Sequence, residues 1–412
     1  MKKKTTSLFL LMAVAVTAMA QPMTYEQYNR LVAERNVLYL AEKYNIDRAT
    51  ALLQASKVFN DPEISVSYGN NQDWDIRMGQ SVEVGLSINP DLAGVRRARI
   101  AVAGNEKEIT EASVAAYLCN LRMEAAQAWA EAWKLRESCN VLEESAKDMQ
   151  QIAGSDSLRL SVGDIGPADA RQSSLEARTF RGELMKCQAE YRNALNVLAL
   201  YCGGLQIDSQ EGELQYEFTI PDENEICTLA EANRSDLKAA LLSRTLSENN
   251  LKLVKASRAF ELNLGLGYSY NTEVRNEIAP APRFNALTVG VSIPLKFSSM
   301  NKGEVAAARA EILQSEKFYE AACLQVRSEA MQAYNSMMVS ISVQRQYTDS
   351  ILEDARSIVQ GRKEGYLKGE SNLVEYLSAQ QTYLDVMQAY IEACCDCFLS
   401  KARLEQAVGC PL

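Results

Sequence analysis

The sequence contains no histidine, and after its first twenty residues it contains no run of about 18 apolar residues. The missing histidine removes the side chain that most often serves as a general base. There is also no glycine-rich phosphate-binding loop before a helical pattern and no nucleophile elbow. We therefore expect no enzymatic activity and no bound cofactor. The missing apolar run predicts that no transmembrane helix follows residue 20.

Positive charge is also scarce. The chain has 43 Lys and Arg residues against 53 Asp and Glu residues, a formal net charge of −10. Nucleic-acid phosphates require a basic protein face, so this balance disfavours nucleic acid as a partner. Two interpretations of the acidic excess remain open, a solvated acidic surface and an acidic lumen that favours cations.

Residues 1–20 have the organisation of a secretory signal peptide. Three lysines at positions 2–4 precede an apolar segment, and Ala18-Met19-Ala20 forms a cleavage site of small residues before Gln21. No cysteine stands at that site, so we expect no bacterial lipid anchor there. The pattern predicts that the protein is exported.

Ten cysteines in an exported protein would ordinarily indicate disulfides. Seven of them lie inside long helical patterns, where we expect them to be packing residues and mostly free thiols; they are Cys119, Cys139, Cys187, Cys323, Cys394, Cys395 and Cys397. The last three form a close group, but three thiols are one fewer than a structural zinc site requires. We therefore expect no metal site.

The two halves of the chain repeat one pattern. Val84-Gly85 matches Val289-Gly290 at a spacing of 205. At a spacing of 206 the matched pairs are Gly163 and Gly369, Asp164 and Glu370, Asp169 and Glu375, Leu198 and Leu404, and Gly203 and Gly409. The pattern predicts a first repeat over 21–203, a linker over 204–222 and a second repeat over 223–412.

The sequence pattern of each repeat predicts four elements in order: an opening helix, a β-hairpin, a long helix, and a return helix that ends at a capping glycine. In the first repeat these elements lie over 25–59, over 62–90, from Gly94 to about Ala153, and up to Gly203. In the second repeat they lie over 223–260, over 261–295, from Gly303 to about Gln360, and up to Gly409. The sequence therefore predicts a mainly helical protein with a small β part.

The strands alternate between apolar and polar residues and end at Pro90 and Pro294, which remove a backbone donor. A tilted strand of about 9–11 residues spans a bilayer, and no strand edge can stay unpaired in lipid. Four strands cannot close a barrel, because about eight are the practical minimum. The chain must therefore pool strands with copies of itself, and both two and three copies satisfy this count.

The return helix of the second repeat carries two apolar seams with heptad spacing. The first seam is Leu373, Leu377, Gln380, Leu384, Met387, Ile391, Cys394 and Phe398, and the second is Val386, Tyr390, Ala393, Cys397 and Leu404. A helix with two seams has two lateral neighbours, as a stave in a cylinder does. An ordinary buried bundle helix is the alternative.

Two segments of the second repeat resemble the TolC family of outer-membrane efflux channels. One is the strand-to-helix segment "VGVSIPL…NKGEVAAARAEI", and the other is the return helix "GYLKGESNLVEYLSAQQTYLDVMQAYIEA…RLEQAVG". Within that family, the sequence pattern is most similar to the cation-efflux (CusC/CzcC) branch. The resemblance implies a homotrimer with a twelve-stranded β-barrel in outer-membrane lipid and a twelve-stave helical tunnel across the periplasm. It implies a periplasmic adaptor protein and an inner-membrane pump of the RND or ABC type as partners.

The resemblance also implies roles for the turns between long and return helices. Adaptor-contacting tips are implied at Val162, Gly163, Asp164, Lys368, Gly369 and Glu370. Glycine allows close backbone approach there, and a plain turn glycine is the alternative. Gate carboxylates are implied at Glu375 and Asp169, with a simple solvated glutamate as the alternative for Glu375. Ser378 and Ser371 replace an aspartate and an arginine of the family, which implies a weaker cation ring and a looser closed state.

The predicted function is the exit duct of a tripartite efflux system, which passively conducts small molecules or metal ions to the exterior. A TolC-like duct for type I protein secretion is the first alternative. A periplasmic coiled-coil adaptor is the second, but it would require a single helical hairpin and a lipoyl-like β domain, and the sequence shows neither.

Overall fold

The computed structural model describes residues 23–71, 74–212, 214, 222–259, 261–295 and 302–411. The predicted signal peptide, over 1–20, lies outside these ranges, as does most of the predicted linker after Gly212. Contacts divide the chain into two compact units. The first comprises Met1–Val37, Leu121–Thr219 and Asn335–Arg403, and the second comprises Leu38–Asn120, Ile220–Tyr334 and Leu404–Leu412. Each unit takes residues from both repeats.

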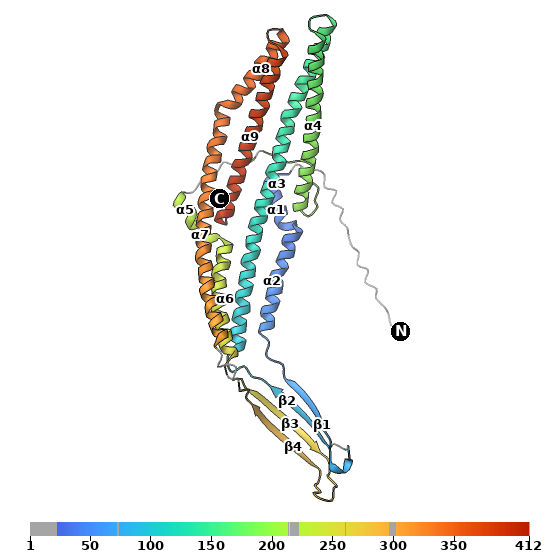
Figure 1. Ribbon diagram of the computed structural model, residues 1–412, viewed down its shortest axis with the longest axis vertical. Helices are drawn as coiled ribbons and strands as arrows, with labels where there is room; N and C mark the ends of the chain where they lie inside the picture. The colour runs from blue at the N-terminus through green and yellow to red at the C-terminus, as the bar shows by residue number, and fades with distance from the viewer. Residues whose placement is uncertain are drawn as a thin grey trace, which may run out of the picture. The chain divides into compact units, whose positions relative to one another are not determined.

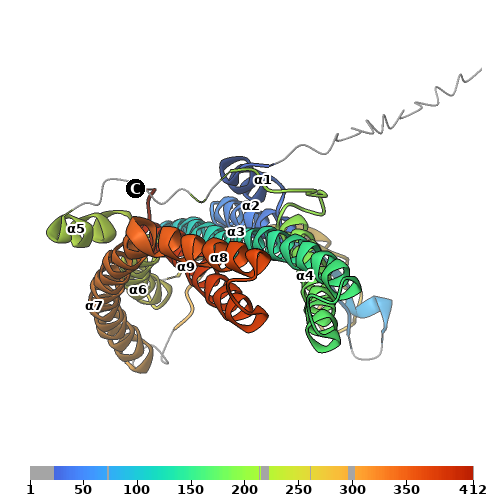
Figure 2. The ribbon, with the colours of Figure 1, turned by 90° about the horizontal axis from the view of Figure 1, so that it is seen from above.

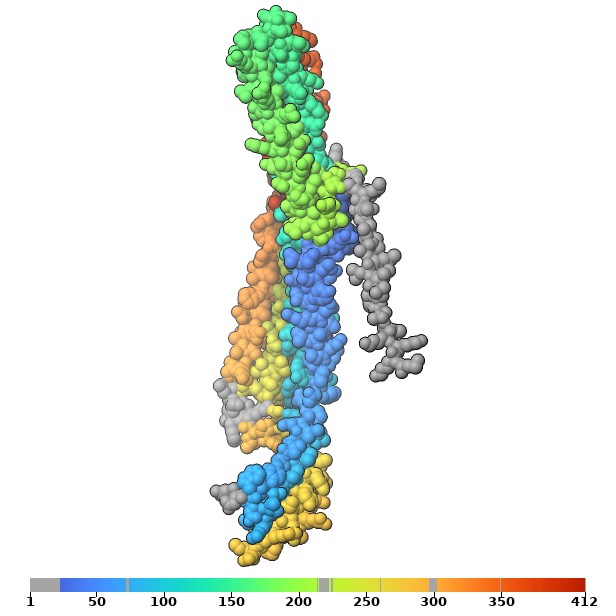
Figure 3. Space-filling model, turned by 90° about the vertical axis from the view of Figure 1, so that its right-hand side faces the viewer, coloured from blue at the N-terminus to red at the C-terminus, as the bar shows by residue number. Residues whose placement is uncertain are grey.

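The second unit contains one antiparallel sheet in the order β1-β2-β3-β4 (Figure 1). Its strands are β1 (Glu63–Gly69), β2 (Ser81–Ile88), β3 (Asn263–Asn271) and β4 (Phe284–Ser292). The two predicted hairpins are therefore present, and β2 pairs with β3 to join them. Figure 3 shows the strands in blue and yellow, with side chains of both hairpins at the surface.

The register places apolar residues from all four strands on one face of the sheet. Val66 pairs with Val84, Val84 with Tyr268, and Tyr268 with Leu287. All four side chains are at least 46% exposed. The pleat therefore presents a continuous apolar face to the surroundings of the chain.

Strands β1 and β2 have 7 and 8 residues, fewer than the 9–11 residues expected for a bilayer crossing. Strand pairing ends after Gly69 because the Asn71 side chain forms hydrogen bonds with the backbone of Asp75. The Asn71 side chain donates to the carbonyl of Asp75 at 2.6 Å and accepts from the Asp75 amide at 3.0 Å. Such side-chain bonds compete with strand pairing, and the short 3₁₀ helix η1 (Ile76–Met78) follows.

Each opening helix is broken, contrary to the prediction of single helices over 25–59 and 223–260. The segments are α1 (Tyr25–Arg35) and α2 (Val37–Ser56) in the first repeat, and α5 (Glu223–Asn233) and α6 (Ser235–Ser257) in the second. Asn36 and Arg234 are extended at the breaks, with ψ of 118°.

A return helix ends against each break. Gly203 and Gly409 have φ of +67° and +81°, and a Cβ added there would approach backbone atoms of Arg35 at 2.6 Å and of Asn233 at 3.1 Å. Only glycine provides both the left-handed backbone and the close approach. The capping role predicted for these two glycines is thus confirmed, and they also pack against the broken helices.

The long helices extend further than predicted. The first repeat has α3 (Val95–Ser161) and α4 (Pro167–Tyr201); the second has α7 (Gly303–Gln346), the π-helical turn η3 (Tyr347–Ile351), α8 (Leu352–Lys368) and α9 (Leu373–Val408). The predicted ends near Ala153 and Gln360 are wrong, because Gly154 and Gly361 lie inside helices. An interior glycine costs about 1 kcal/mol, which the neighbouring helical residues offset. In both Figures 1 and 2, α4 lies beside α3 and α9 beside α8.

Burial along α9 agrees with its first predicted seam, because Leu373, Gln380, Ile391, Cys394 and Phe398 are all buried. No helix within the described ranges is both long enough and apolar enough to cross a membrane.

The expectation of free thiols is wrong for two cysteines. Cys139 of α3 and Cys187 of α4 form a disulfide with a Cα–Cα distance of 5.7 Å. The two helices of the first hairpin run side by side, so residues 48 positions apart in sequence face each other. The other eight cysteines, all within the described ranges, form no disulfide.

Candidate functional site at the helical tips

Both turns between a long helix and a return helix have the same backbone geometry. Gly163 and Gly369 have φ of +79° and +80°. The Asp164 amide donates to the Arg159 carbonyl at 2.9 Å, and the Glu370 amide donates to the Gly365 carbonyl at 2.8 Å. This is the Schellman motif, in which a left-handed glycine ends a helix and satisfies its last carbonyls. Six residues are exposed on these tips: Val162, Gly163, Asp164, Lys368, Gly369 and Glu370.

The space around the two tip glycines is open. A Cβ at Gly163 would meet no atom within 4 Å, and one at Gly369 would meet only Nη2 of Arg159, at 4.0 Å. Within the described chain, the turn conformation therefore accounts for both glycines without a packing requirement. The open surface leaves room for a partner.

Glu375 occupies the first turn of α9 and has local partners. Its amide donates to Oδ1 of Asn372 at 2.9 Å, and its Oε1 accepts from Nδ2 of Asn372 at 3.1 Å. Nη1 of Arg362 lies 2.7 Å from Oε2. A carboxylate is favoured at a helix N-terminus, so this glutamate has a structural role in addition to any role in a gate.

The other predicted gate residues lie around the same tips. Asp169 is exposed in the first turn of α4. Ser371 donates to the carbonyl of Arg362 at 3.4 Å, and Ser378 is exposed on α9. In the described part of the chain, no hydrogen bond or ion pair joins Asp169 to Glu375.

The structure adds a buried polar cluster that sequence reasoning missed. Asp156 of α3 is completely buried, and the hydroxyl of Tyr366 in α8 donates to it, 2.9 Å from each carboxylate oxygen. Arg159 lies with Nη1 3.9 Å from Asp156 and with Nε 2.7 Å from Asp164. We call Asp156, Arg159, Asp164 and Tyr366 the tip latch. It joins the long helix of one repeat to that of the other.

Asp156 and Tyr366, the two buried members of the tip latch, lie beside an apolar core. Burial is the main cause that raises the pKa of Tyr366 well above its usual range, and the hydrogen bond to Asp156 is the second. The hydroxyl therefore stays protonated and donates at neutral pH. Hydrogen bonds are stronger in such a low-dielectric setting. The buried core residues are Met149, Ile152, Phe180, Tyr366, Leu373 and Tyr376.

A sequence signal for the latch exists. Met149, Ile152 and Asp156 follow the spacing of three and four that marks a helical seam, and a carboxylate at a seam position requires a buried partner. Nothing in the sequence identifies that partner, since Tyr366 lies 210 positions away.

Comparison with known proteins agrees with this architecture. Residues 226–410 match the family described as outer membrane efflux protein. The cobalt-zinc-cadmium resistance protein CzcC of Cupriavidus metallidurans is 22% identical, over 95% of this chain and 91% of that protein. The outer membrane protein TolC of Vibrio cholerae is 24% identical over 184 residues, 44% of this chain and 42% of that protein.

Solved structures of outer-membrane channels have the same fold. CusC, studied for its folding and transmembrane channel formation, superposes with a TM-score of 0.75 at 18% identity, covering 95% of this chain and 96% of that one. The Campylobacter jejuni CmeC outer membrane channel gives a TM-score of 0.76 at 16% identity, covering 93% and 85%.

The fold and the matches define an outer-membrane transport channel rather than an enzyme. The family match over residues 226–410 and the similarity to CzcC over almost the whole chain support the resemblance to TolC-family efflux channels, and the fold is that of such channels. The predicted mainly helical, duplicated fold and the predicted family are confirmed.

Proposed function

We propose that the protein is the exit duct of a tripartite efflux system and passively conducts metal ions from an inner-membrane pump and a periplasmic adaptor to the exterior. The observation that carries this proposal is the sheet. Its apolar face is exposed, with Ile64 72%, Val66 70% and Val289 75% accessible. The residues between them on the strands, such as Ser65 and Gly290, are small or polar, as suits a water-filled interior.

The edges of this sheet require copies of the chain. Strands β1 and β4 are the two ends of the strand order, and no other described strand pairs with their outer edges. An unpaired edge is unstable in lipid, where water cannot satisfy its backbone groups. Three copies supply twelve strands and close a barrel that is wide enough for a channel.

Two features favour cations as the transported class. The chain carries a formal charge of −10, and Glu83 lies on the polar face of the sheet, between its cross-strand partners Ser67 and Ser269. The similarity to a cobalt-zinc-cadmium resistance protein covers almost the whole chain. An acidic interior raises the local concentration of cations and lowers that of anions.

A deletion strain tests the transported class. We expect loss of the gene to reduce tolerance of Zn²⁺, Co²⁺ and Cd²⁺, and the wild-type gene to restore it. Unchanged metal tolerance with loss of a secreted protein from the medium would instead support the secretion duct. The genes beside this one would identify the pump as the RND or ABC type.

The tips are proposed as the periplasmic end of the duct. Their exposed turns, with Gly163 and Gly369 at the centre, would receive the adaptor. The tip latch would hold the closed state, because it ties α3 to α8 where the two hairpins end. Glu375 and Asp169 would line the constriction, with Ser371 and Ser378 nearby.

A further inference from the structure

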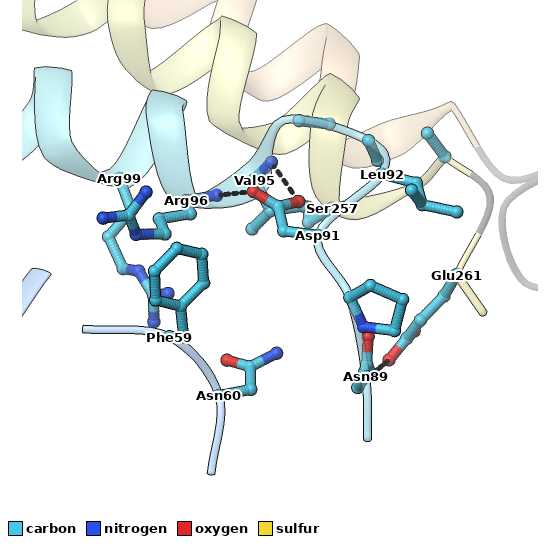
Figure 4. Close-up of a pocket in the computed structure, with 14 residues that line it drawn as sticks. Phe59, Asn60, Asn89, Asp91, Leu92, Val95, Arg96, Arg99, Ser257 and Glu261 are labelled. Atoms are coloured by element: carbon cyan, nitrogen blue, oxygen red, sulfur yellow. Dashed lines mark hydrogen bonds between the residues drawn. The ribbon is translucent and has the colours of Figure 1, made fainter. Parts of the chain in front are cut away.

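A cavity of about 250 Å³ lies in the second unit, beside the ends of the strands (Figure 4). Three parts of the chain line it. The first is Phe59 and Asn60 after α2, and the second runs from the end of β2 into the first turns of α3. The third lies before β3 and contributes Ala256, Ser257, Ala259 and Glu261. Asn89 directly follows the last residue of β2. The cavity therefore lies at the level where the exposed apolar face of the sheet ends.

Arginines form one side of the cavity. Arg96 stacks on Phe59, with its guanidinium carbon 4.0 Å from the ring centroid, and its Nε donates to the carbonyl of Lys57 at 2.7 Å. These contacts fix the side chain and leave its two terminal nitrogens available. Arg99 also lines the cavity, and no carboxylate of the described residues pairs with either arginine.

The carboxylates of the cavity are already engaged. Asp91 accepts from the amides of Val95 at 2.9 Å and of Arg96 at 2.7 Å, so it occupies the N-terminus of α3. Glu261 accepts from the side chain of Asn89 at 2.9 Å, on the other side of the cavity from Arg99 (Figure 4). The two guanidinium groups are thus left to bind an external anion.

The repeats differ at this point. Counting from Gly94 and Gly303, the glycines at which the two long helices were predicted to start, the first repeat continues as VRRARIA and the second as EVAAARA. The positions of Arg96 and Arg99 hold Val305 and Ala308 in the second repeat. A requirement of the shared fold would act on both copies, so the fold alone does not account for these arginines.

We propose that this cavity binds the phosphate of a membrane phospholipid headgroup, with Arg96 and Arg99 as donors. The inference rests on the proposed placement of the sheet in the outer membrane. Guanidinium groups bind phosphate oxygens in a bidentate manner, and basic pockets at headgroup depth select anionic lipids. A volume of about 250 Å³ is smaller than most drug-sized sites, so it holds a headgroup only. The acyl chains would then lie along Leu92, which is 62% exposed, and the apolar face of the sheet.

Native mass spectrometry of the purified protein in mild detergent, titrated with dioctanoyl phosphatidylglycerol, tests the proposal. We expect the double variant R96Q/R99Q to bind about tenfold more weakly, the effect of losing about 1.4 kcal/mol of charge-assisted hydrogen bonding. R309Q is the matched control, since Arg309 is an exposed arginine near the start of α7 that does not line the cavity. Equal lipid binding by the double variant and the wild type would overturn the proposal.

Two further experiments complete the test. The first identifies the source of the phosphate, and the second distinguishes weaker binding from misfolding of the double variant. Inorganic phosphate and dioctanoylglycerol should not displace the lipid; displacement by inorganic phosphate would assign the site to free phosphate and refute the lipid. Arg96 supports local packing, whereas Arg99 is exposed and its side chain forms no hydrogen bond or ion pair with the described residues, so R99Q alone should weaken binding without loss of folding. Binding by R99Q equal to that of the wild type would count against the proposal.

The same preparations are recorded in planar bilayers to separate this inference from the proposed function. Wild-type protein that conducts ions but binds lipid without any dependence on Arg99 would refute the lipid site alone. Protein that binds lipid through Arg99 but never conducts would support the lipid site and refute the channel.

Discussion

Substitution of Tyr366 by Phe removes the only hydroxyl among the described residues that bonds to the buried carboxylate of Asp156. That carboxylate has no solvent exposure and would retain only Nη1 of Arg159, at 3.9 Å. Leaving a buried charged acceptor short of a partner costs about 2 kcal/mol. In the proposed duct the closed state would bear this cost, whereas an open state in which α3 and α8 have separated would not. We therefore expect the ratio of open to closed channels to rise by about 30-fold per protomer.

Single-channel recording in planar bilayers measures this ratio. Tyr376→Phe is the matched control, because Tyr376 belongs to the same buried core and donates to Gln380 at 3.3 Å within its own helix. It loses a buried tyrosine hydroxyl without untying two helices. We expect Tyr366→Phe to be open for longer and Tyr376→Phe to behave as the wild type. Equal behaviour of the two variants would refute the latch.

The remaining predictions concern the thiols, the gate and the tips. Denatured, unreduced protein should show eight reactive thiols; ten would contradict the disulfide. Burial raises the pKa of Cys395 to about 12, so at pH 8 native protein should resist iodoacetamide there and become reactive only as the pH approaches that value; rapid labelling at pH 8 would show that the thiol is accessible. Glu375→Gln should weaken block of the current by multivalent cations, and unchanged block would place Glu375 outside the constriction. Gly369→Trp costs about 1–2 kcal/mol of backbone strain and should preserve assembly but abolish metal resistance, whereas Gly369→Asn, which tolerates the left-handed backbone, should retain resistance. Normal resistance with tryptophan would place the adaptor contact elsewhere.

The sequence was sufficient to predict the elements that depend on local periodicity. The alternation through Val82, Val84 and Leu86 predicts a half-exposed strand, and the structure pairs these residues with Tyr68, Val66 and Ile64 of the neighbouring strand. Duplication strengthened this prediction, because the same order of elements recurs in the second repeat.

The sequence was not sufficient where long-range contacts decide the local conformation. Asparagine is only a weak helix former, which alone does not predict a break at Asn36. The long-range contacts favour the break: the Asn36 side chain donates to the carbonyl of Tyr201, and Gly203 approaches Arg35. The reverse error occurred at Gly154, where a residue typical of turns lies within a helix.

The candidate site shows the same division. The tip glycines Gly163 and Gly369 were predicted, because turn chemistry is local and the repeat places them in register. The bond between Asp156 and Tyr366 was not, because each residue lies in an unremarkable helical segment and only the packing of α3 against α8 brings them together. The disulfide between Cys139 and Cys187 was missed for the same reason.

The central claim is that one chain supplies only part of a closed sheet and that three copies complete it. The molecular mass of the protein in mild detergent, measured by light scattering with the detergent contribution subtracted, tests this claim most directly. We predict a particle of three chains. A monodisperse single chain that retains its full β-sheet signal in circular dichroism would contradict the account, because the outer edges of strands β1 and β4 would then be stable in detergent without pairing to another described strand.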